Sequence, residues 1–231
     1  MTLVRAPRVR TTTSRRTLGA AVAAAAIVAT LGACGGDSAS LVGYEIRPVP
    51  HVGDLTLDAA SVNDAAFTIR AKPGQLLVTF LGFTNCPDAC PTALAEIRAA
   101  LNRLGDDADR VDVAMITVDP DRDTSEVLTS YVQQIVPGAV ALRTDDTEQL
   151  RRVSDAFGAT SAVEHDHAGN VNVGHTDHTY LVDERGDVVL TWTGDMTTDD
   201  IVNDLNIVIE RLDSERVTDP RPSDPIGAAA G

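Results

Sequence analysis

Cysteine, lysine and aromatic residues are scarce in this chain of 231 residues, and the shortages narrow the classes of protein it can belong to. The chain has three cysteines, a single lysine (Lys72) and only 3% aromatic residues. Three cysteines are too few to hold a secreted domain of this size together with disulfide bonds. Because aromatic side chains are so few, we expect the core to consist of Val, Leu, Ile and Ala.

The first 33 residues lack acidic side chains and have the order of an export signal. Five arginines precede an apolar run of about fifteen residues, Thr17 to Leu31. A run of this length is shorter than the roughly twenty residues that span a bilayer as a helix. A basic segment, an apolar segment and then small residues are typical of a signal peptide. We therefore predict a signal peptide at residues 1–33 and a flexible tether at residues 34–43.

The end of this segment, Leu31-Gly32-Ala33-Cys34, resembles the lipobox of bacterial lipoproteins. In that pattern the cysteine is lipidated and becomes the first mature residue. The resemblance predicts lipidation of Cys34 and a lipid-anchored protein on the extracytoplasmic side of the cell membrane. The alternative is a plain signal peptide with an incidental Cys34. Ser14-Arg15-Arg16 also matches a twin-arginine export signal in part, so the export route stays open.

A net positive charge is also lacking. Five of the 19 basic residues precede Cys34, which leaves 14 basic against 34 acidic residues in a mature chain. Such a surface repels nucleic acid and anionic lipid. We therefore expect no nucleic-acid partner, and we expect the anchor to hold by its acyl chains alone.

The two remaining cysteines, Cys86 and Cys90, lie between a predicted strand and a predicted helix. The apolar run Leu76–Leu81 suits a buried central strand, and Pro91 suits the first turn of a helix. A helix N-terminus favours the thiolate form of a nearby cysteine. Two thiolates are a soft ligand pair that suits Cu(I), and an added imidazole would support Cu(II). The residues alone leave a metal site, a redox pair and a structural disulfide open.

The rest of residues 44–212 alternates between strand and helix patterns. Further strands are predicted at 111–118, 139–142, 179–182 and 188–192, and helices at 93–104, 123–136, 145–157 and 197–211. With a cysteine pair after the first central strand, this order predicts an α/β thioredoxin-like fold. Its central mixed sheet is flanked by helices and followed by a C-terminal β-hairpin and a closing helix. We expect a disordered tail at residues 213–231 because they are polar and contain prolines.

Three ordered motifs resemble the Sco/SenC family of copper-binding assembly factors. Gly82–Thr92 looks like the family's cysteine signature, and Val118–Thr124 is similar to its strand-end motif. His175-Thr176, followed by Tyr180–Asp183, resembles its metal histidine and the strand after it. The resemblance covers roughly Leu76 to Trp192.

The resemblance implies a copper site formed by Cys86, Cys90 and His175. It also implies that copper is delivered to, or thiols are reduced in, the binuclear copper site of cytochrome c oxidase subunit II, with other copper-handling proteins as further partners. One departure is Gly174, which stands where many relatives carry Asp, so the orientation of the neighbouring histidine is open to change.

Other ionisable residues are candidates for a second metal site. His165, His167 and His178 flank the predicted ligand His175, and they form either an auxiliary metal-capture site or part of a solvated loop. The carboxylates of Asp119–Asp123 lack the glycine and the final glutamate of a calcium loop, so a turn and a helix cap fit them better.

The same cysteines also suit an enzyme, a thiol-disulfide oxidoreductase that reduces the cysteines of a copper-site partner. Their three-residue spacer differs from the two-residue spacer of ordinary thioredoxin chemistry. A redox or copper sensor at the cell surface is a further alternative. A peroxidase is disfavoured, because peroxiredoxins place Thr three residues before the reactive cysteine and this chain has Phe83 there.

Overall fold

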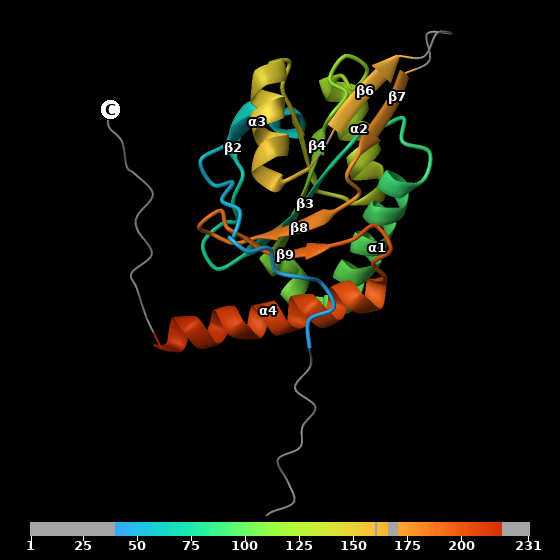
Figure 1. The fold of residues 1–231 in the computed structure, drawn as a ribbon. Coiled ribbons are helices and arrows are strands. Elements are labelled where there is room, and N and C mark those ends of the chain that lie inside the picture. The colour runs from blue at the N-terminus through green and yellow to red at the C-terminus, as the bar shows by residue number, and fades with distance from the viewer. Residues whose placement is uncertain (1–39, 160, 166–170, 219–231) are drawn as a thin grey trace, which may run out of the picture. The chain divides into compact units, whose positions relative to one another are not determined.

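The computed structural model describes residues 40–159, 161–165 and 171–218 (Figure 1). The predicted signal peptide, Cys34 and the last thirteen residues of the chain lie outside this part. Within the described residues, no helix is both long and apolar enough to cross a membrane.

A seven-stranded mixed sheet forms the centre of the fold, in the order β2-β1-β5-β4-β3-β8-β9. β3 pairs in parallel with β4, and β4 with β5, while the remaining pairs are antiparallel. The strands are β1 (Thr56–Ala59), β2 (Ala65–Thr68), β3 (Leu76–Gly82), β4 (Val111–Thr117), β5 (Val140–Arg143), β8 (Thr179–Val182) and β9 (Val188–Trp192). All seven residues of β3 are buried, as its continuous apolar sequence predicts.

Helices cover both faces of the sheet. α1 (Ala89–Leu104), α2 (Ser125–Ile135) and α4 (Thr198–Thr218) pack on one face, where Val78 and Phe80 of β3 point. α3 (Thr147–Phe157) packs on the other face, against Leu77 and Leu81. Two short 3₁₀ helices, Ala60–Val62 and Gly105–Arg110, connect elements. The layered arrangement is the predicted one, a mixed sheet flanked by helices with a hairpin and helix at the end.

The start of α2 differs slightly from the helix predicted from residue 123, with its cap among the carboxylates of Asp119–Asp123. The helix begins at Ser125, and the N-cap is Thr124, whose Oγ1 accepts a hydrogen bond from the Val127 N–H at 3.3 Å. Asp123 is fully buried and binds other groups. The prediction was wrong by one residue because either neighbour has a side chain that can cap a helix.

The closing helix is longer than its apolar pattern indicates. α4 continues to Thr218, so the prediction of disorder from residue 213 is wrong for residues 213–218. Both terminal nitrogens of Arg110 donate to the carboxylate of Asp213, at 3.0 and 2.8 Å. Arg216 lies 3.5 Å from Glu184. These long-range ion pairs supply partners for the last turns of α4, and a local pattern cannot show them.

The predicted tether is docked over its last four residues. The N–H groups of Val42 and Gly43 each donate to the carboxylate of Asp204 at 2.8 Å. The indole nitrogen of Trp192 donates to the same carboxylate at 2.8 Å, and Asp204 is fully buried. A Cβ atom on Gly43 would lie 2.9 Å from the Thr191 carbonyl oxygen, so the close approach needs glycine. The tether prediction is therefore wrong for residues 40–43.

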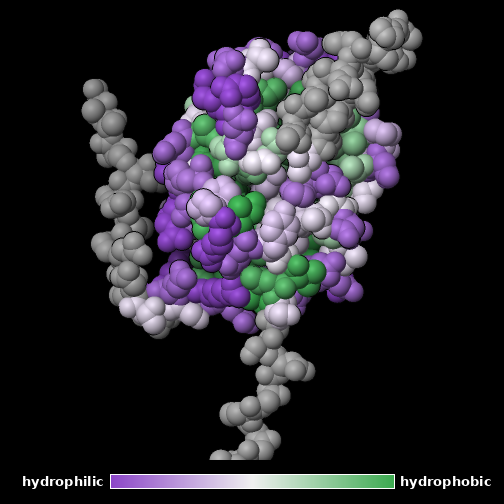
Figure 2. Space-filling view, viewed as in Figure 1, coloured by the Kyte–Doolittle hydropathy of each residue, from purple (hydrophilic) through white to green (hydrophobic). Residues whose placement is uncertain are grey.

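A second, two-stranded sheet occupies the segment predicted as a His-rich loop. β6 (Ser161–His165) and β7 (Val171–His175) are antiparallel, with Ser161 opposite His175 and His165 opposite Val171. The hydrophilic residues of this segment make the strand pattern hard to recognise in the sequence, although Val163 and Val173 are paired in the register and β-branched residues favour strands. Figure 2 shows that, among the residues coloured by hydropathy, the visible face is mostly hydrophilic, with separate small hydrophobic patches.

Candidate metal centre

Two neighbouring strands bring the cysteine loop and His175 to the same end of the main sheet. β3 and β8 are antiparallel, and Phe80 near the end of β3 pairs with Thr179 at the start of β8. The chain leaves β3 at Gly82 toward Cys86, and it enters β8 at Thr179, four residues after His175. The segments that carry the three predicted ligands therefore meet at one end of the sheet, although they are about ninety residues apart in the sequence.

The cysteines lie at the N-terminus of α1, where the sequence predicts them. Cys90 is the second residue of the helix and is 1% exposed, whereas Cys86 is half-buried in the preceding loop. Both are thiols rather than a disulfide. The backbone N–H of Cys90 donates to the Sγ of Cys86 at 3.4 Å. The Cys86 sulfur thus accepts a hydrogen bond from one of the N–H groups that have no partner within the helix at its N-terminus. The N-terminus of a helix is a place that favours negative charge.

Burial acts on Cys90 in the opposite direction. Burial raises the pKa of the Cys90 thiol, the neighbouring Cys86 raises it further, and a backbone hydrogen bond with Phe83 opposes the rise. Cys90 therefore keeps its proton near neutral pH in the absence of a positive partner. A bound cation would replace that proton and remove the cost of a buried negative charge.

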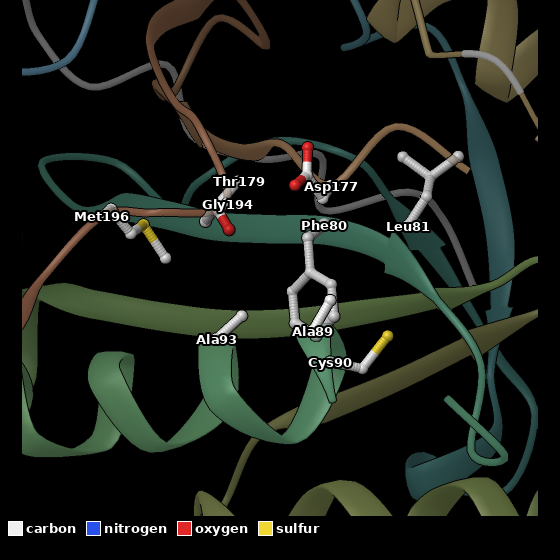
Figure 3. A pocket seen from close by; sticks show the side chains of 9 residues that line it. All are labelled: Phe80, Leu81, Ala89, Cys90, Ala93, Asp177, Thr179, Gly194 and Met196. Carbon is white, nitrogen blue, oxygen red and sulfur yellow. The ribbon is translucent and has the colours of Figure 1, made fainter. Parts of the chain in front are cut away.

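A small cavity of about 10 Å³ separates the start of α1 from the segment that follows His175 (Figure 3). Ala89 and Cys90 line it from the helix side, and Asp177 lines it from the other side. A Cβ atom on Gly194 would lie 2.2 Å from Oδ2 of Asp177, so the carboxylate occupies the space that Gly194 leaves open. Asp177, two residues beyond His175, is therefore a direct neighbour of the first turn of α1.

The other histidines have different surroundings. The Nδ1 of His178 lies 3.3 Å from the Tyr44 hydroxyl, and its ring contacts Tyr44 and Tyr180 edge-on at centroid distances of 6.0 and 6.2 Å. His165 pairs with Val171, four residues along the strand from the pair that contains His175. At about 3.3 Å per residue, the two histidines are roughly 13 Å apart along the ribbon. His167 lies outside the described residues.

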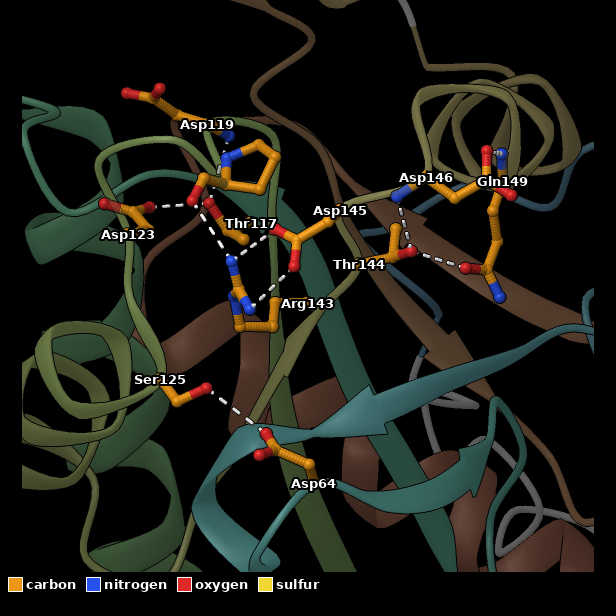
Figure 4. A network of polar contacts seen from close by, with 11 residues as sticks. Asp64, Thr117, Asp119, Asp123, Ser125, Arg143, Thr144, Asp145, Asp146 and Gln149 are labelled. Carbon is orange, nitrogen blue, oxygen red and sulfur yellow. Dashed lines mark hydrogen bonds and ion pairs between the residues drawn. The ribbon is translucent and has the colours of Figure 1, made fainter.

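Asp123 clamps the loop that carries Cys86, a role that the sequence analysis missed. Its buried carboxylate accepts hydrogen bonds from the N–H of Thr84 at 3.1 Å and from the hydroxyls of Thr84 and Thr117. Figure 4 shows Asp123 beside Thr117 at the end of β4. Asp119, in turn, forms an ion pair with Arg122. Among the side chains that the structure describes, no three His, Cys, Asp or Glu residues gather as a metal site.

A mixed sheet with three helices on one face, and a thiol pair where the first of them begins, define a thioredoxin-like protein with a candidate metal or redox centre. The chain matches the SCO1/SenC family over residues 57–210 and belongs to that family. The family and the fold predicted from the sequence motifs are thereby confirmed.

Relatives and solved structures agree with this assignment. A protein of Stutzerimonas stutzeri, whose name describes copper binding, is 34% identical over 131 residues, 56% of this chain and 64% of that protein. The chain thus spans a little under two thirds of that relative. The apo Sco1 structure of Thermus thermophilus has a TM-score of 0.65 and 28% identity, and covers 75% of this chain and 99% of that one. ScoI of Bradyrhizobium japonicum, solved with copper bound, has a TM-score of 0.57 and 29% identity, covering 66% and 96%.

Proposed function

We propose that this protein binds copper through Cys86, Cys90 and His175 and passes it on during assembly of the binuclear copper site of cytochrome c oxidase. The observation that carries the proposal is the thiol pair at the start of α1, at the end of the sheet where the chain runs on from His175. Membership of the SCO1/SenC family and the copper held by the Bradyrhizobium japonicum relative support copper as the ligand. The oxidase as recipient follows from the family resemblance.

The donor set fits copper as a cargo. Two thiolates are soft ligands for Cu(I), and an imidazole from His175 would add a donor that Cu(II) favours. Cys86 already accepts a hydrogen bond from the Cys90 N–H at the helix terminus, so this ligand is held beside Cys90 before copper arrives. Cys90 releases its proton on binding, which makes copper affinity dependent on pH.

The predicted export signal and lipidation of Cys34 complete the proposal. They would hold the copper centre at the extracytoplasmic face of the membrane, close to a partner such as subunit II of the oxidase. The docked residues 40–43 leave only a few residues between Cys34 and the folded domain, so the anchor would keep the domain near the lipid surface.

A second candidate function uses the same thiols in disulfide exchange. The half-buried Cys86, beside a helix N–H, has the surroundings of an attacking thiolate, whereas Cys90 is buried and protonated like a resolving thiol. In this role the protein would reduce the cysteines of a copper-site partner. Attack by one thiolate and resolution by the other would leave a Cys86–Cys90 disulfide and a reduced dithiol in the partner.

An anaerobic Cu(I) titration against a competing chelator separates the two functions. We expect the reduced chain from residue 35 onward to bind one Cu(I). Cys86→Ser and Cys90→Ser should each weaken binding by more than about 100-fold, since residues that merely support metal ligands already contribute 10–100-fold. Thr92→Ser, on the first turn of the same helix, is the matched control and should bind as the wild type does. A wild type that binds no copper but reduces disulfide substrates would leave only the oxidoreductase.

A further inference from the structure

Gly82 is the last residue of β3, a strand whose seven residues are all buried. A glycine inside a strand weakens the strand, because it has no side chain to pack and loses more conformational freedom on folding than other residues do. The φ angle of Gly82 is not positive, so the backbone at this position does not itself need glycine. The reason for a glycine here must therefore lie in what occupies the space beside it.

The sulfur of Cys90 occupies that space. A Cβ atom on Gly82 would lie 2.7 Å from the Cys90 Sγ, too close for both atoms to stay where they are. It would also lie 3.0 Å from Cε2 of Phe80 and 3.1 Å from Cε of Met115, where a small shift of either side chain is enough. Cys90, Phe80 and Met115 belong to one buried cluster, and Figure 3 shows Phe80 pointing from β3 toward the start of α1. The Cys90 sulfur thus lies in a notch that consists of Gly82, Phe80 and Met115.

This notch fixes the direction in which the Cys90 side chain points. Side chains occupy a few staggered positions about each rotatable bond, so an atom that fills the place of the sulfur sends the sulfur to another of these positions. The half-buried Cys86 is held differently, because its Sγ accepts a hydrogen bond from the Cys90 backbone N–H. That bond does not depend on the direction of the Cys90 side chain. One sulfur is therefore placed by the end of β3, and the other by the N-terminus of α1.

We propose that Gly82 is a positioning residue for the cysteine pair, and that its missing side chain lets the Cys90 sulfur point in the direction from which it binds a metal together with Cys86. A larger residue at this position moves the Cys90 sulfur out of the notch while Cys86 keeps its place. The metal-binding part of this inference rests on the proposed copper function, whereas the packing of Cys90 on Gly82 does not.

Urea unfolding of the reduced, metal-free chain from residue 35 onward tests the packing. Gly82→Ala should lower the midpoint of unfolding. In a Cys90→Ala background the same substitution should lower it by about half as much or less, because the atom that the new methyl group meets is gone. An equal loss in both backgrounds would mean that the methyl group meets Phe80, Met115 or the backbone instead, and the proposal would be wrong. If Gly82→Ala does not fold, a double variant that folds supports the proposal, and a double variant that also fails to fold overturns it.

Cu(I) affinity, measured against a competing chelator, tests the consequence for the metal centre. We expect Gly82→Ala to weaken binding by at least about tenfold, since residues that support metal ligands contribute 10–100-fold. Ala114→Val is the matched control and should bind as the wild type does. Ala114 is a buried residue of β4 that packs in the core on the other face of the sheet, so its enlargement crowds the core without approaching Cys90.

The two measurements separate this inference from the proposed function. Equal Cu(I) affinity in the wild type and Gly82→Ala would contradict the positioning role while leaving copper binding intact. A wild type that binds no Cu(I) would contradict the proposed copper function, and the unfolding comparison alone would then decide whether Gly82 positions Cys90.

Discussion

At the scale of single residues, one buried carboxylate connects the cysteine loop to the sheet. Asp123 follows β4 in the sequence but joins Thr84, before the cysteines, to Thr117 at the end of β4. The sequence shows only an acidic turn after an apolar strand. The carboxylate is buried because it accepts hydrogen bonds from two threonines. One of them, Thr84, is about forty residues away from Asp123 in the sequence.

We predict that Asp123→Asn lowers the free energy of unfolding by about 2–4 kcal/mol, because an amide has one acceptor oxygen for three buried donors. Urea unfolding measures this change. Asp121→Asn, at an exposed neighbouring position, is the control and should cost less than about 0.5 kcal/mol. Equal costs for the two variants would show that the clamp does not hold the loop.

A second residue-scale prediction concerns pH. The hydrogen bond between Nδ1 of His51 and Asp187, 2.8 Å long, raises the pKa of His51 from its ordinary 6.5, and burial opposes the rise. A raised pKa means that the contribution to stability is complete below pH 6.5 and is lost as the pH rises through the folded-state pKa. The side chain is 45% exposed, so solvent screening limits the effect to less than about 1 kcal/mol.

We therefore expect His51→Asn to destabilise the protein more at pH 5.5 than at pH 8.5, as measured by chemical unfolding at both values. In an Asp187→Asn background the difference between the two pH values should become smaller, and Asp54, 3.7 Å from Nε2 of His51, accounts for what remains. A larger loss at pH 8.5 would mean that the histidine is stabilised in its neutral form and would contradict the assignment.

At the scale of elements, sequence periodicity predicts the interiors of strands and helices and fails where distant groups fix the ends. The strands at 76–82 and 111–117 and the helix after Pro91 agree closely with the predictions because their apolar patterns are strong. The last turns of α4 depend on Arg110, and the start of the domain depends on Asp204. Neither of these two contacts can be recognised from the local sequence pattern.

The N-terminal segment gives an element-scale prediction. Asp204→Asn removes the carboxylate that holds the N–H groups of Val42 and Gly43, so we expect residues 40–44 to detach while the sheet stays folded. Hydrogen exchange of Gly43 should become at least about tenfold faster, since each lost hydrogen bond to a charged group contributes more than 1 kcal/mol. Glu210→Gln, at an exposed position of the same helix, should leave the exchange unchanged. Protection that persists in Asp204→Asn would contradict the docking role.

At the scale of the whole molecule, the candidate site exists because the sheet order places β8 beside β3. The sequence identifies Cys86 and Cys90 as a reactive pair from their place before a helix. It singles out His175 from four other histidines only through its resemblance to the family motif. Periodicity cannot show which strands become neighbours, so the meeting of the two segments at one end of the sheet is what the structure adds.

The assignment of all three ligands to one copper centre is the central claim, and X-ray absorption at the copper edge of the copper-loaded chain tests it most directly. We predict two sulfur ligands and one imidazole nitrogen around copper in the wild type. The nitrogen signal should disappear in His175→Ala and persist in His178→Ala. A wild-type spectrum without two sulfur ligands, or a nitrogen signal that survives in His175→Ala, would contradict the account.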